Sequence, residues 1–252
     1  NPTIGLPSTS GLMVLFSAKT GVLEALLLDN GYLTDIRTAA AGAVAARHLS
    51  RDDSRKACVI GAGAQGALQL KALCLVRPIE QAAIWARDPS KAKALAKRLT
   101  KELDINVTAA QDISNAVTEA DIIVTTTPAS TPLIMANWLR PGQHITAMGS
   151  DQHHKNELQS ECLVRANLYV PDRQSQTEKL GELHHALNDG LIDSNKIFPE
   201  LGNIVAGLTT GRRSADDITI CDLTGTGVQD TAIATLALQC AESSGAGTQF
   251  NN

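Results

Sequence analysis

Residues 56–73, KACVIGAGAQGALQLKAL, decide the fold of this 252-residue chain. A strand-like apolar run ends at Gly61, and Gly63 and Gly66 complete the pattern G-x-G-x-x-G as a helical pattern begins at Ala64. In a βαβ unit that binds a dinucleotide, the first glycine permits the tight turn, the second lets the backbone approach a pyrophosphate, and the third lets the helix pack on the strand. The phosphates lie at the positive N-terminus of that helix. The stretch therefore predicts a dinucleotide site, and a glycine turn that only packs is the alternative.

Strand-like and helical patterns alternate after residue 55. Seven apolar runs are typical of strands: KACVI, QAAIWA, INVTA, DIIVTTT, QHITAMG, ANLYVP and DITICDL. This alternation predicts an α/β fold with a doubly wound parallel sheet of the Rossmann type. Residues 11–29 precede it and predict a β-hairpin, whose turn contains Gly21. We expect Thr34 to cap an alanine-rich helix after the hairpin, and residues 227–241 to form a final helix.

The composition is that of an ordinary globular protein, with 43% hydrophobic residues and a net charge of −4. Because the chain is not basic and only 3% of its residues are aromatic, we expect no nucleic-acid partner. No apolar run reaches the roughly 18 residues that span a bilayer, so we expect a cytoplasmic protein without a membrane partner. The five cysteines are widely spaced and no Cys/His ligand spacing occurs, which predicts reduced thiols and no metal site.

The end of the second predicted strand bears on the choice between NAD and NADP. An NAD site typically has an acid here, about 20 residues after the glycines, which binds the ribose 2′-hydroxyl. This chain has Ala86 and Arg87 instead, and a guanidinium suits a 2′-phosphate. NADP(H) is therefore favoured. NAD(H) is the alternative, because Asp88 could still bind a hydroxyl and Arg87 could simply begin a surface helix.

Two other strand ends and one helix start carry candidate side chains. Thr126 belongs to a cluster of hydroxyls that either lines the cofactor channel or forms a turn. Asp151 follows Gly149, where the backbone can be approached closely, and either faces a nicotinamide or caps a helix that begins near residue 154. Arg37 lies near a predicted helix N-terminus, where it opposes the helix dipole, so it either binds an anion or faces solvent.

Several motifs occur together in one order: LTDIRTAAAGAVAA, VIGAGAQG, the strand end TTTP, AMGSD followed by HKNEL, and the closing DLTGTGVQD. Their order and spacing resemble the ornithine cyclodeaminase/mu-crystallin family over nearly the whole chain. The stretch GSDQHHKNEL and the opening LPSTSGLMVLFSAKTG are most similar to the branch of the family associated with ectoine utilisation.

The resemblance implies roles for individual residues. Arg37 matches the arginine that binds the substrate carboxylate, and Asp151 matches the catalytic aspartate. The pair Ala86 and Arg87 is similar to that of NADPH-binding members and differs from the ornithine-specific ones, which have an acid there. Further positions match residues around the cofactor or hydroxyls on its phosphate side: Ala64, Gln65, Gly149, Ser150, Lys155, Ser8 and Thr38.

Two departures limit what the resemblance implies. Family members normally begin upstream and carry a substrate-binding lysine and arginine in that part, so half of the expected substrate pocket has no counterpart in this sequence. The family's closing motif often has a serine near the nicotinamide, whereas this chain has Thr224 before Gly225. Thr224 either replaces that contact or the contact is absent.

We therefore expect a Rossmann domain over residues 51–223 and a second, α+β domain for substrate binding and dimerisation, formed by residues 1–50 and 224–252. The resemblance implies a homodimeric enzyme that transfers a hydride between NAD(P) and the α-carbon of an amino or imino acid. A cyclodeaminase, which releases ammonia and uses NAD catalytically, is one alternative. A binding protein without enzymatic activity, similar to some mu-crystallins, is the other.

Overall fold

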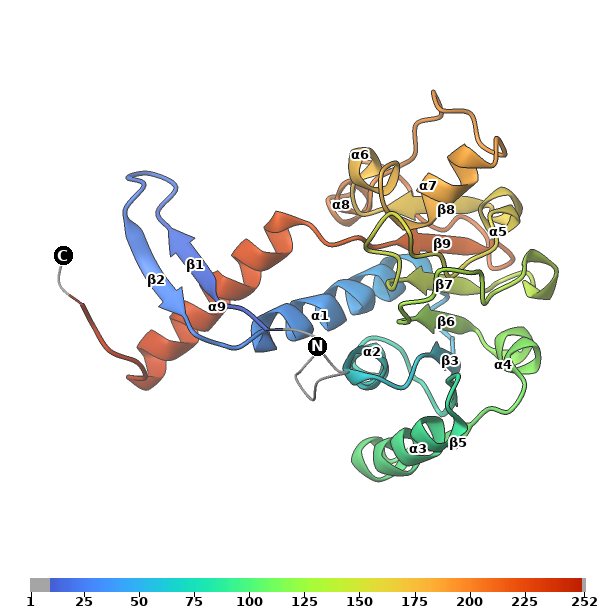
Figure 1. Cartoon of the computed structure of the whole chain (residues 1–252), viewed down its shortest axis with the longest axis horizontal. Coiled ribbons are helices and arrows are strands. Elements are labelled where there is room, and N and C mark those ends of the chain that lie inside the picture. The colour runs from blue at the N-terminus through green and yellow to red at the C-terminus, as the bar shows by residue number, and fades with distance from the viewer. Residues whose placement is uncertain (1–9, 251–252) are drawn as a thin grey trace. The chain divides into compact units, whose positions relative to one another are not determined.

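The computed structural model describes residues 10–250, so Ser8 lies outside the described residues. Seven parallel strands form one sheet in the order β5-β4-β3-β6-β7-β9-β8 (Figure 1). Each of the seven apolar runs contains one of these strands, so the predicted α/β fold with a parallel sheet is confirmed. Their bounds are β3 (Lys56–Ile60), β4 (Gln81–Trp85), β5 (Asn106–Ala109), β6 (Ile122–Thr125), β7 (His144–Ala147), β8 (Leu168–Pro171) and β9 (Thr219–Asp222).

Strand order reverses between β3 and β6. From β3 the chain adds β4 and β5 on one side, and from β6 it adds β7, β9 and β8 on the other. Ligands of open α/β sheets bind at such a switch point, beyond the carboxyl ends of the strands. Ile60 pairs with Thr125 and Thr125 with Ala147 in the parallel register, so β3, β6 and β7 end in one row. The loops that follow these three strands form the candidate site.

Helices cover both faces of the sheet. Successive strand residues point to opposite faces, so neighbouring residues of one strand lie in different cores. Cys58 and Ile60 of β3 lie in the core beneath one set of helices, α4 (Ile113–Glu119), α5 (Glu161–Arg165) and α7 (Gly181–Asn188). Ala57 and Val59 lie in the opposite core, with α2 (Ala64–Cys74) and α3 (Pro89–Leu103). The remaining short helices of the sheet-containing part are η2 (Ala136–Trp138), α6 (Gln174–Thr177) and α8 (Leu201–Val205).

The hairpin and the final helix lie outside the sheet. β1 (Met13–Phe16) and β2 (Leu23–Leu27) pair antiparallel, as predicted, and Gly21 has φ +70° in the turn. α9 (Gly227–Ser244) packs against β1 and extends three residues beyond the prediction. α1 (Tyr32–Leu49) begins before Thr34, so the predicted cap is wrong. Asp29 accepts the Leu33 amide at 2.7 Å instead, because a carboxylate just before a helix can bind a free N–H of the first turn.

The chain divides into two compact units. One comprises Asn1–Thr38 and Thr226–Asn252, and the other comprises Ala39–Gly225. The predicted domains have their boundaries after residues 50 and 223. Their assignment to dinucleotide binding and to substrate binding with dimerisation stays a prediction. Within the range that the structure describes, no helix has the length and apolar character needed to cross a membrane.

The close approach of α2 to β3 gives a stability prediction. A Cβ on Gly66 would lie 2.2 Å from the carbonyl oxygen of Gly61, which is backbone and cannot turn aside. We expect Gly66→Ala to lower the free energy of unfolding by about 1–3 kcal/mol, despite the higher helix propensity of alanine. Urea denaturation measures the change.

Gly202 is the matched control, since it is also helical but a Cβ added there would have no atom within 4 Å. Gly202→Ala should be neutral or stabilise the protein by up to about 1 kcal/mol, because alanine favours the helix. If Gly66→Ala proved as stable as Gly202→Ala, the close approach would not exist in solution.

Candidate functional site

The turn between β3 and α2 has the features that a pyrophosphate requires. Gly61 has φ +123°, and a Cβ there would lie 2.4 Å from Oγ1 of Thr126. Gly63 precedes α2, is exposed, and has open space around its missing Cβ. Among residues 10–250, no side chain caps this helix. Its first amides therefore need an acceptor from solvent or a ligand, and a phosphate at the positive helix end fits that need.

The segment after β4 separates the roles of Arg87 and Asp88. Asp88 caps α3, accepting the Ser90 amide at 2.9 Å and the Ser90 hydroxyl at 2.6 Å. These hydrogen bonds, chiefly that of the hydroxyl, lower the pKa of the Asp88 carboxyl. Arg87 is exposed and has no hydrogen bond or ion pair with any other described residue. The carboxylate is thus committed to the helix, and the guanidinium is available to a ligand.

Thr126 lies directly beside the glycine turn. Its amide and its hydroxyl both donate to the carbonyl oxygen of Ile60, at 2.8 and 3.2 Å. Thr127 faces another partner, since its amide and hydroxyl both donate to Glu157 Oε1 at 2.6 Å. The hydroxyl cluster after β6 is therefore divided between the turn and a buried carboxylate.

Asp151 and Lys155 form an ion pair beyond the end of β7. Lys155 Nζ lies 2.5 Å from Asp151 Oδ1, and 49% of the Asp151 side chain is exposed against 17% of Lys155. Residues 152–154 form a bend and a turn, and the next helix is α5, which begins at Glu161. The alternative in which Asp151 caps a helix near residue 154 is therefore wrong. Capping does not explain this carboxylate, and its exposure leaves it accessible to a substrate.

Gly149 and Ser150, which precede Asp151, are engaged with two buried acids. The Gly149 amide donates to Glu157 Oε2 at 2.8 Å, and a Cβ on Gly149 would lie 2.2 Å from the Thr127 carbonyl oxygen. The hydroxyl of Ser150 is buried and donates to Glu182 Oε1. Any contact between Ser150 and a cofactor would thus have to involve its backbone rather than this hydroxyl.

Thr224 and Gly225 are held by the end of β8. Asp172 Oδ2 accepts both of their amides, at 2.9 and 2.8 Å, and Oδ1 accepts the Thr224 hydroxyl at 3.1 Å. Gln176 Nε2 donates to that hydroxyl and to the Gly225 carbonyl oxygen, at 2.9 and 2.6 Å. Burial raises the pKa of the Asp172 carboxyl. The Thr224 hydroxyl is therefore a part of this local network.

Arg37 faces a carboxylate of its own unit rather than solvent. Its Nε donates to Asp230 Oδ1 at 2.9 Å and its Nη1 to Gln229 Oε1 at 3.2 Å, and only 19% of the side chain is exposed. Both partners lie in the first turn of α9. The anion expected near Arg37 is thus supplied by the protein. Thr38 donates its hydroxyl to the Thr34 carbonyl oxygen at 2.7 Å.

Three fully buried acids behind the Asp151 segment were not predicted: Glu157, Glu182 and Asp222. Burial raises the pKa of Glu182 to about 8 and that of Asp222 to about 7, and it also raises the pKa of Glu157. The folded chain therefore binds these protons more tightly than the unfolded chain does. Between the ordinary value of 4.5 and about 8 for Glu182, rising pH lowers the free energy of unfolding through this group.

The structure brings all of the predicted site residues of the sheet-containing unit to the loops and helix starts that follow β3, β4, β6, β7 and β9. These are Gly61, Gly63, Ala64, Gln65, Gly66, Arg87, Thr126, Gly149, Ser150, Asp151, Lys155, Thr224 and Gly225. Arg37 and Thr38 belong to the other unit. Asp222 could have been noticed as a charge at the end of the apolar run of β9, but Glu157 lies among polar residues, and nothing local points to it or to Glu182.

Comparison with known proteins agrees with this geometry. A family model described as the ornithine cyclodeaminase/mu-crystallin family matches residues 1–245. An uncharacterised cyclodeaminase of Sinorhizobium fredii is 60% identical over 252 residues, which are 100% of this chain and 76% of the relative.

Two solved structures have nearly the same fold. One is the Δ1-pyrroline-2-carboxylate reductase of Thermococcus litoralis in complex with NADH and L-proline, with a TM-score of 0.93, 35% identity, and coverage of 99% of this chain and 77% of that one. The other is an archaeal alanine dehydrogenase dimer with bound NAD, with a TM-score of 0.92, 34% identity, and coverage of 100% and 77%.

These likenesses confirm the predicted enzyme class, and the neighbours' cofactors agree with the prediction of a nicotinamide dinucleotide. The reductase and the dehydrogenase also agree with the predicted hydride transfer at an amino or imino acid. By the match of its family model and by its likeness to a relative of 60% identity, the chain belongs to the ornithine cyclodeaminase/mu-crystallin family.

Proposed function

We propose that the chain catalyses reversible hydride transfer between a nicotinamide dinucleotide and the α-carbon of a small amino or imino acid. The observation that carries the proposal is the common row in which β3, β6 and β7 end, with the uncapped glycine turn after β3 and the exposed carboxylate of Asp151 after β7. The first amides of α2 would hold the pyrophosphate of a dinucleotide at this turn, and Asp151 would supply an acid at the same edge of the sheet.

A bound nicotinamide would supply or accept the hydride. In the reducing direction, Asp151 donates a proton to the nitrogen that leaves the reaction as the amine, and in the oxidising direction it removes that proton. Lys155 holds the Asp151 carboxyl by the 2.5 Å ion pair and so limits its rotation. Positioning of this kind contributes to rate, because the reacting groups lose less freedom in the transition state.

Arg37 is proposed to bind the substrate carboxylate. A guanidinium has five N–H donors in a planar fork, and Asp230 and Gln229 engage only its Nε and Nη1. A substrate carboxylate therefore has donors to bind while the contact with α9 is kept, or it replaces Asp230 as the partner. In both cases the positive charge of Arg37 has a carboxylate beside it.

A cyclodeaminase is the second candidate, favoured by the name of the relative that is 60% identical. Such an enzyme oxidises a diamino acid, closes a ring on the imine, releases ammonia and returns the same hydride, so that the cofactor shows no net change. One assay separates the two candidates: the protein is given cyclic and acyclic imino acids with reduced cofactor, and diamino acids with oxidised cofactor. Net oxidation of NAD(P)H supports the reductase, and ammonia release without net redox change supports the cyclodeaminase.

Arg87 predicts the choice of cofactor. We expect NADPH to bind more tightly than NADH, because Arg87 is free of protein partners within the described residues while Asp88 is committed to capping α3. Arg87→Ala should weaken NADPH binding about tenfold or more and leave NADH binding nearly unchanged, since an arginine contact to a phosphate contributes roughly 1.5–3 kcal/mol. Fluorescence titration of both cofactors measures the effect.

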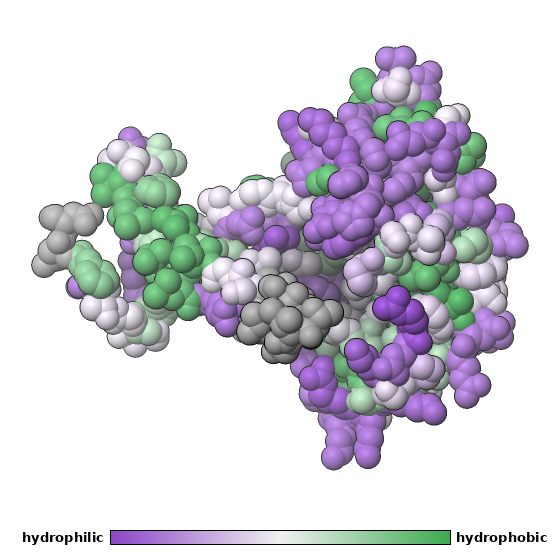
Figure 2. Space-filling view, in the orientation of Figure 1, coloured by the Kyte–Doolittle hydropathy of each residue, from purple (hydrophilic) through white to green (hydrophobic). Residues whose placement is uncertain are grey.

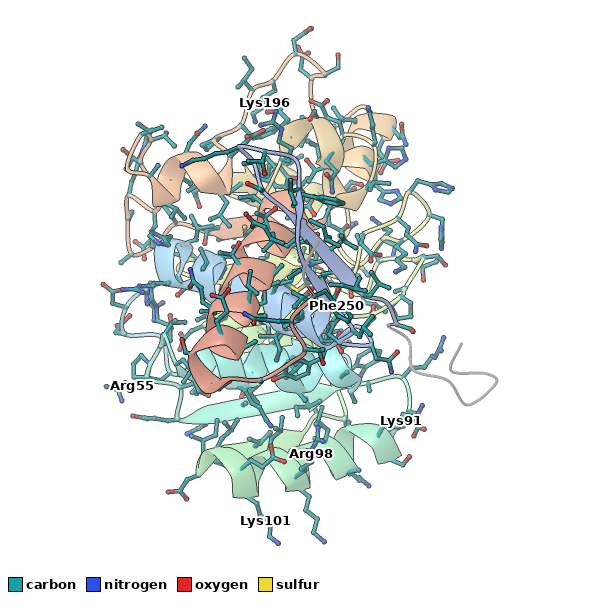
Figure 3. All side chains as sticks on the ribbon, turned by 90° about the vertical axis from the view of Figure 1, so that its left-hand side faces the viewer. Arg55, Lys91, Arg98, Lys101, Lys196 and Phe250 are labelled. Atoms are coloured by element: carbon teal, nitrogen blue, oxygen red, sulfur yellow. The ribbon has the colours of Figure 1, made fainter. Side chains whose placement is uncertain are left out.

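Arg98 is the matched control, because it is an exposed arginine on α3, the helix that begins two residues after Arg87 (Figure 3). Lys101 of this helix points into the solvent in the same view. Arg98→Ala should change neither affinity. Equal affinity of the unaltered protein for NADPH and NADH, or a preference for NADH, would contradict the assignment to NADP.

Asp151 is tested by a nearly isosteric change. If its carboxyl transfers the proton, Asp151→Asn should bind cofactor normally while turnover falls by roughly two to four orders of magnitude. Steady-state kinetics on the substrate that the assay of imino and diamino acids identifies, together with cofactor titration, separates turnover from cofactor binding. Near-normal turnover would remove Asp151 from the mechanism.

The hairpin supports the proposal of a homodimer. Leu15 of β1 is buried, yet Val14 and Phe16 on the opposite face are 44% and 59% exposed, and Leu26, which pairs with Val14, is 54% exposed. Figure 2 shows hydrophobic residues gathered over β1 and β2. A two-stranded sheet with two apolar faces needs a second partner. A second copy of the chain is that partner in the proposal, and the structurally similar archaeal alanine dehydrogenase is itself a dimer.

The dimer predicts the result of changing this outer face. Sedimentation equilibrium at micromolar concentration should give twice the mass of one chain for the unaltered protein, and one mass for the variant Phe16→Glu/Leu26→Glu, because buried charges would oppose association. Lys19→Glu in the hairpin turn is the control and should remain dimeric. A monomeric unaltered protein would rule out the proposal.

A further inference from the structure

We propose that Glu157 and Glu182 are positioning residues, which fix both ends of the segment 149–158 and thereby set the place of Asp151. This role deepens the proposed function and rests on it for the part that Asp151 plays. Neither acid is in contact with the reacting atoms. Each acts through the backbone of the segment that carries the catalytic carboxyl.

Glu157 closes the segment onto its own beginning. Its carboxylate is fully buried and accepts the Gly149 amide at 2.8 Å through Oε2. Through Oε1 it accepts the amide and hydroxyl of Thr127, both at 2.6 Å. One carboxylate therefore joins the ends of β6 and β7 and fixes the residue that precedes Ser150 and Asp151.

Glu182 of α7 holds the same segment from the other side. The residue is 1% exposed, and Oε1 accepts the Glu157 amide at 2.9 Å and the Ser150 hydroxyl. Oε2 accepts the Leu158 amide at 3.1 Å and Asn156 Nδ2 at 3.0 Å. The contacts reach both the start and the end of the segment, so one side chain secures both.

The residues between these anchors are the exposed ones. Residues 151–154 are exposed and Lys155 is half-buried, whereas Ser150 and the residues 156–158 are buried. His185 Nε2 also lies 2.7 Å from the Lys155 carbonyl oxygen. The segment is thus a short loop with fixed ends, and Asp151 lies one residue from the anchored Ser150. Displacement of that anchor moves Asp151 directly.

Both positions require a side chain with two acceptor oxygens, which a carboxyl has and an amide lacks. The two oxygens of Glu157 each accept a backbone N–H, and so do the two oxygens of Glu182. A glutamine in either orientation places its NH2 group against one of these N–H donors. The requirement is the same whether or not Glu182 carries a proton, since the Ser150 hydroxyl can either donate to the carboxyl or accept from it.

The alternative is that the two acids only stabilise the fold. Leaving a buried donor without an acceptor costs about 1–3 kcal/mol wherever it occurs, so a loss of stability does not discriminate. A displacement confined to the segment 149–158, and a loss of turnover that depends on Asp151, do discriminate. The experiment measures both.

The first readout is hydrogen–deuterium exchange of the full chain without cofactor, compared between the unaltered protein and Glu182→Gln. We expect exchange over residues 149–158 to become at least tenfold faster, with β3 and β4 still protected. Asp121→Asn is the matched control, because Asp121 accepts the backbone amides of Arg55 and Lys56 at the amino ends of the strands, at 2.8 and 2.9 Å. That variant should leave the exchange of residues 149–158 unchanged.

The second readout is a double-mutant cycle in turnover. Glu182→Gln should lower kcat about ten- to a hundredfold with cofactor affinity within about threefold, since misplacement of a reacting group by about 1 Å has effects of this size. In the background of Asp151→Asn, the same change should have almost no further effect on kcat. Asp121→Asn should leave kcat and KM unchanged.

Ser150→Ala is the milder variant, and it serves if Glu182→Gln does not fold. It removes one of the donors to Glu182 and should increase exchange at the start of the segment. Unchanged exchange over residues 149–158 in a folded Glu182→Gln or Ser150→Ala variant overturns the positioning role. A kcat loss that multiplies with that of Asp151→Asn overturns it as well. Failure of the unaltered protein to reduce any imino acid counts against the proposed function alone, because the exchange result still decides whether the acids hold the segment.

Discussion

No side chain fits between position 66 and the carbonyl oxygen of Gly61, and the candidate site depends on this constraint. With glycine at both places, α2 begins directly over the end of β3, and its first amides lie at the switch point between β3 and β6. Thr126 then packs on the same turn from β6. The parallel register of β3, β6 and β7 aligns the ends of these strands. The position of the glycine turn is therefore linked to that of Asp151 through three neighbouring strands.

The acids around the site are stabilised in an unusual way. Within the described part of the chain, none of Glu157, Glu182, Asp172 and Asp222 forms an ion pair with a lysine or arginine. Backbone amides and neutral side chains compensate them instead, including the first amides of α7 for Asp222, at 2.8 and 3.2 Å. Amide dipoles are fixed by the fold, whereas lysine and arginine side chains move. Compensation by amides therefore gives an acid a defined position, and it offsets only a part of the rise in pKa that burial causes.

Much of the fold could be predicted from the sequence, because its signals are local. The seven strands are apolar runs bounded by helical patterns, and the glycine pattern identifies the first βαβ unit without knowledge of other contacts. The candidate cofactor residues follow from the same logic, since strand ends meet at one edge of a parallel sheet.

The errors and omissions in the prediction arise where two local signals compete or where the partner is distant in the sequence. Asp29 and Thr34 could both cap α1, and the sequence does not show which residue the chain brings to the first amides. Glu182 lies 32 residues from Ser150, and Asp230 lies 193 residues from Arg37, so neither contact has a spacing that sequence patterns could reveal. Polar networks in the interior depend on the packed fold as a whole.

The division of labour at the start of α3 has an evolutionary consequence. Asp88 alone secures the first turn of the helix, and the neighbouring position 87 takes no part in it. Mutations at position 87 can therefore be sampled during divergence without loss of folding. With Arg87 in its proposed role at a 2′-phosphate, single substitutions at this position would exchange one dinucleotide for the other, each in a folded protein.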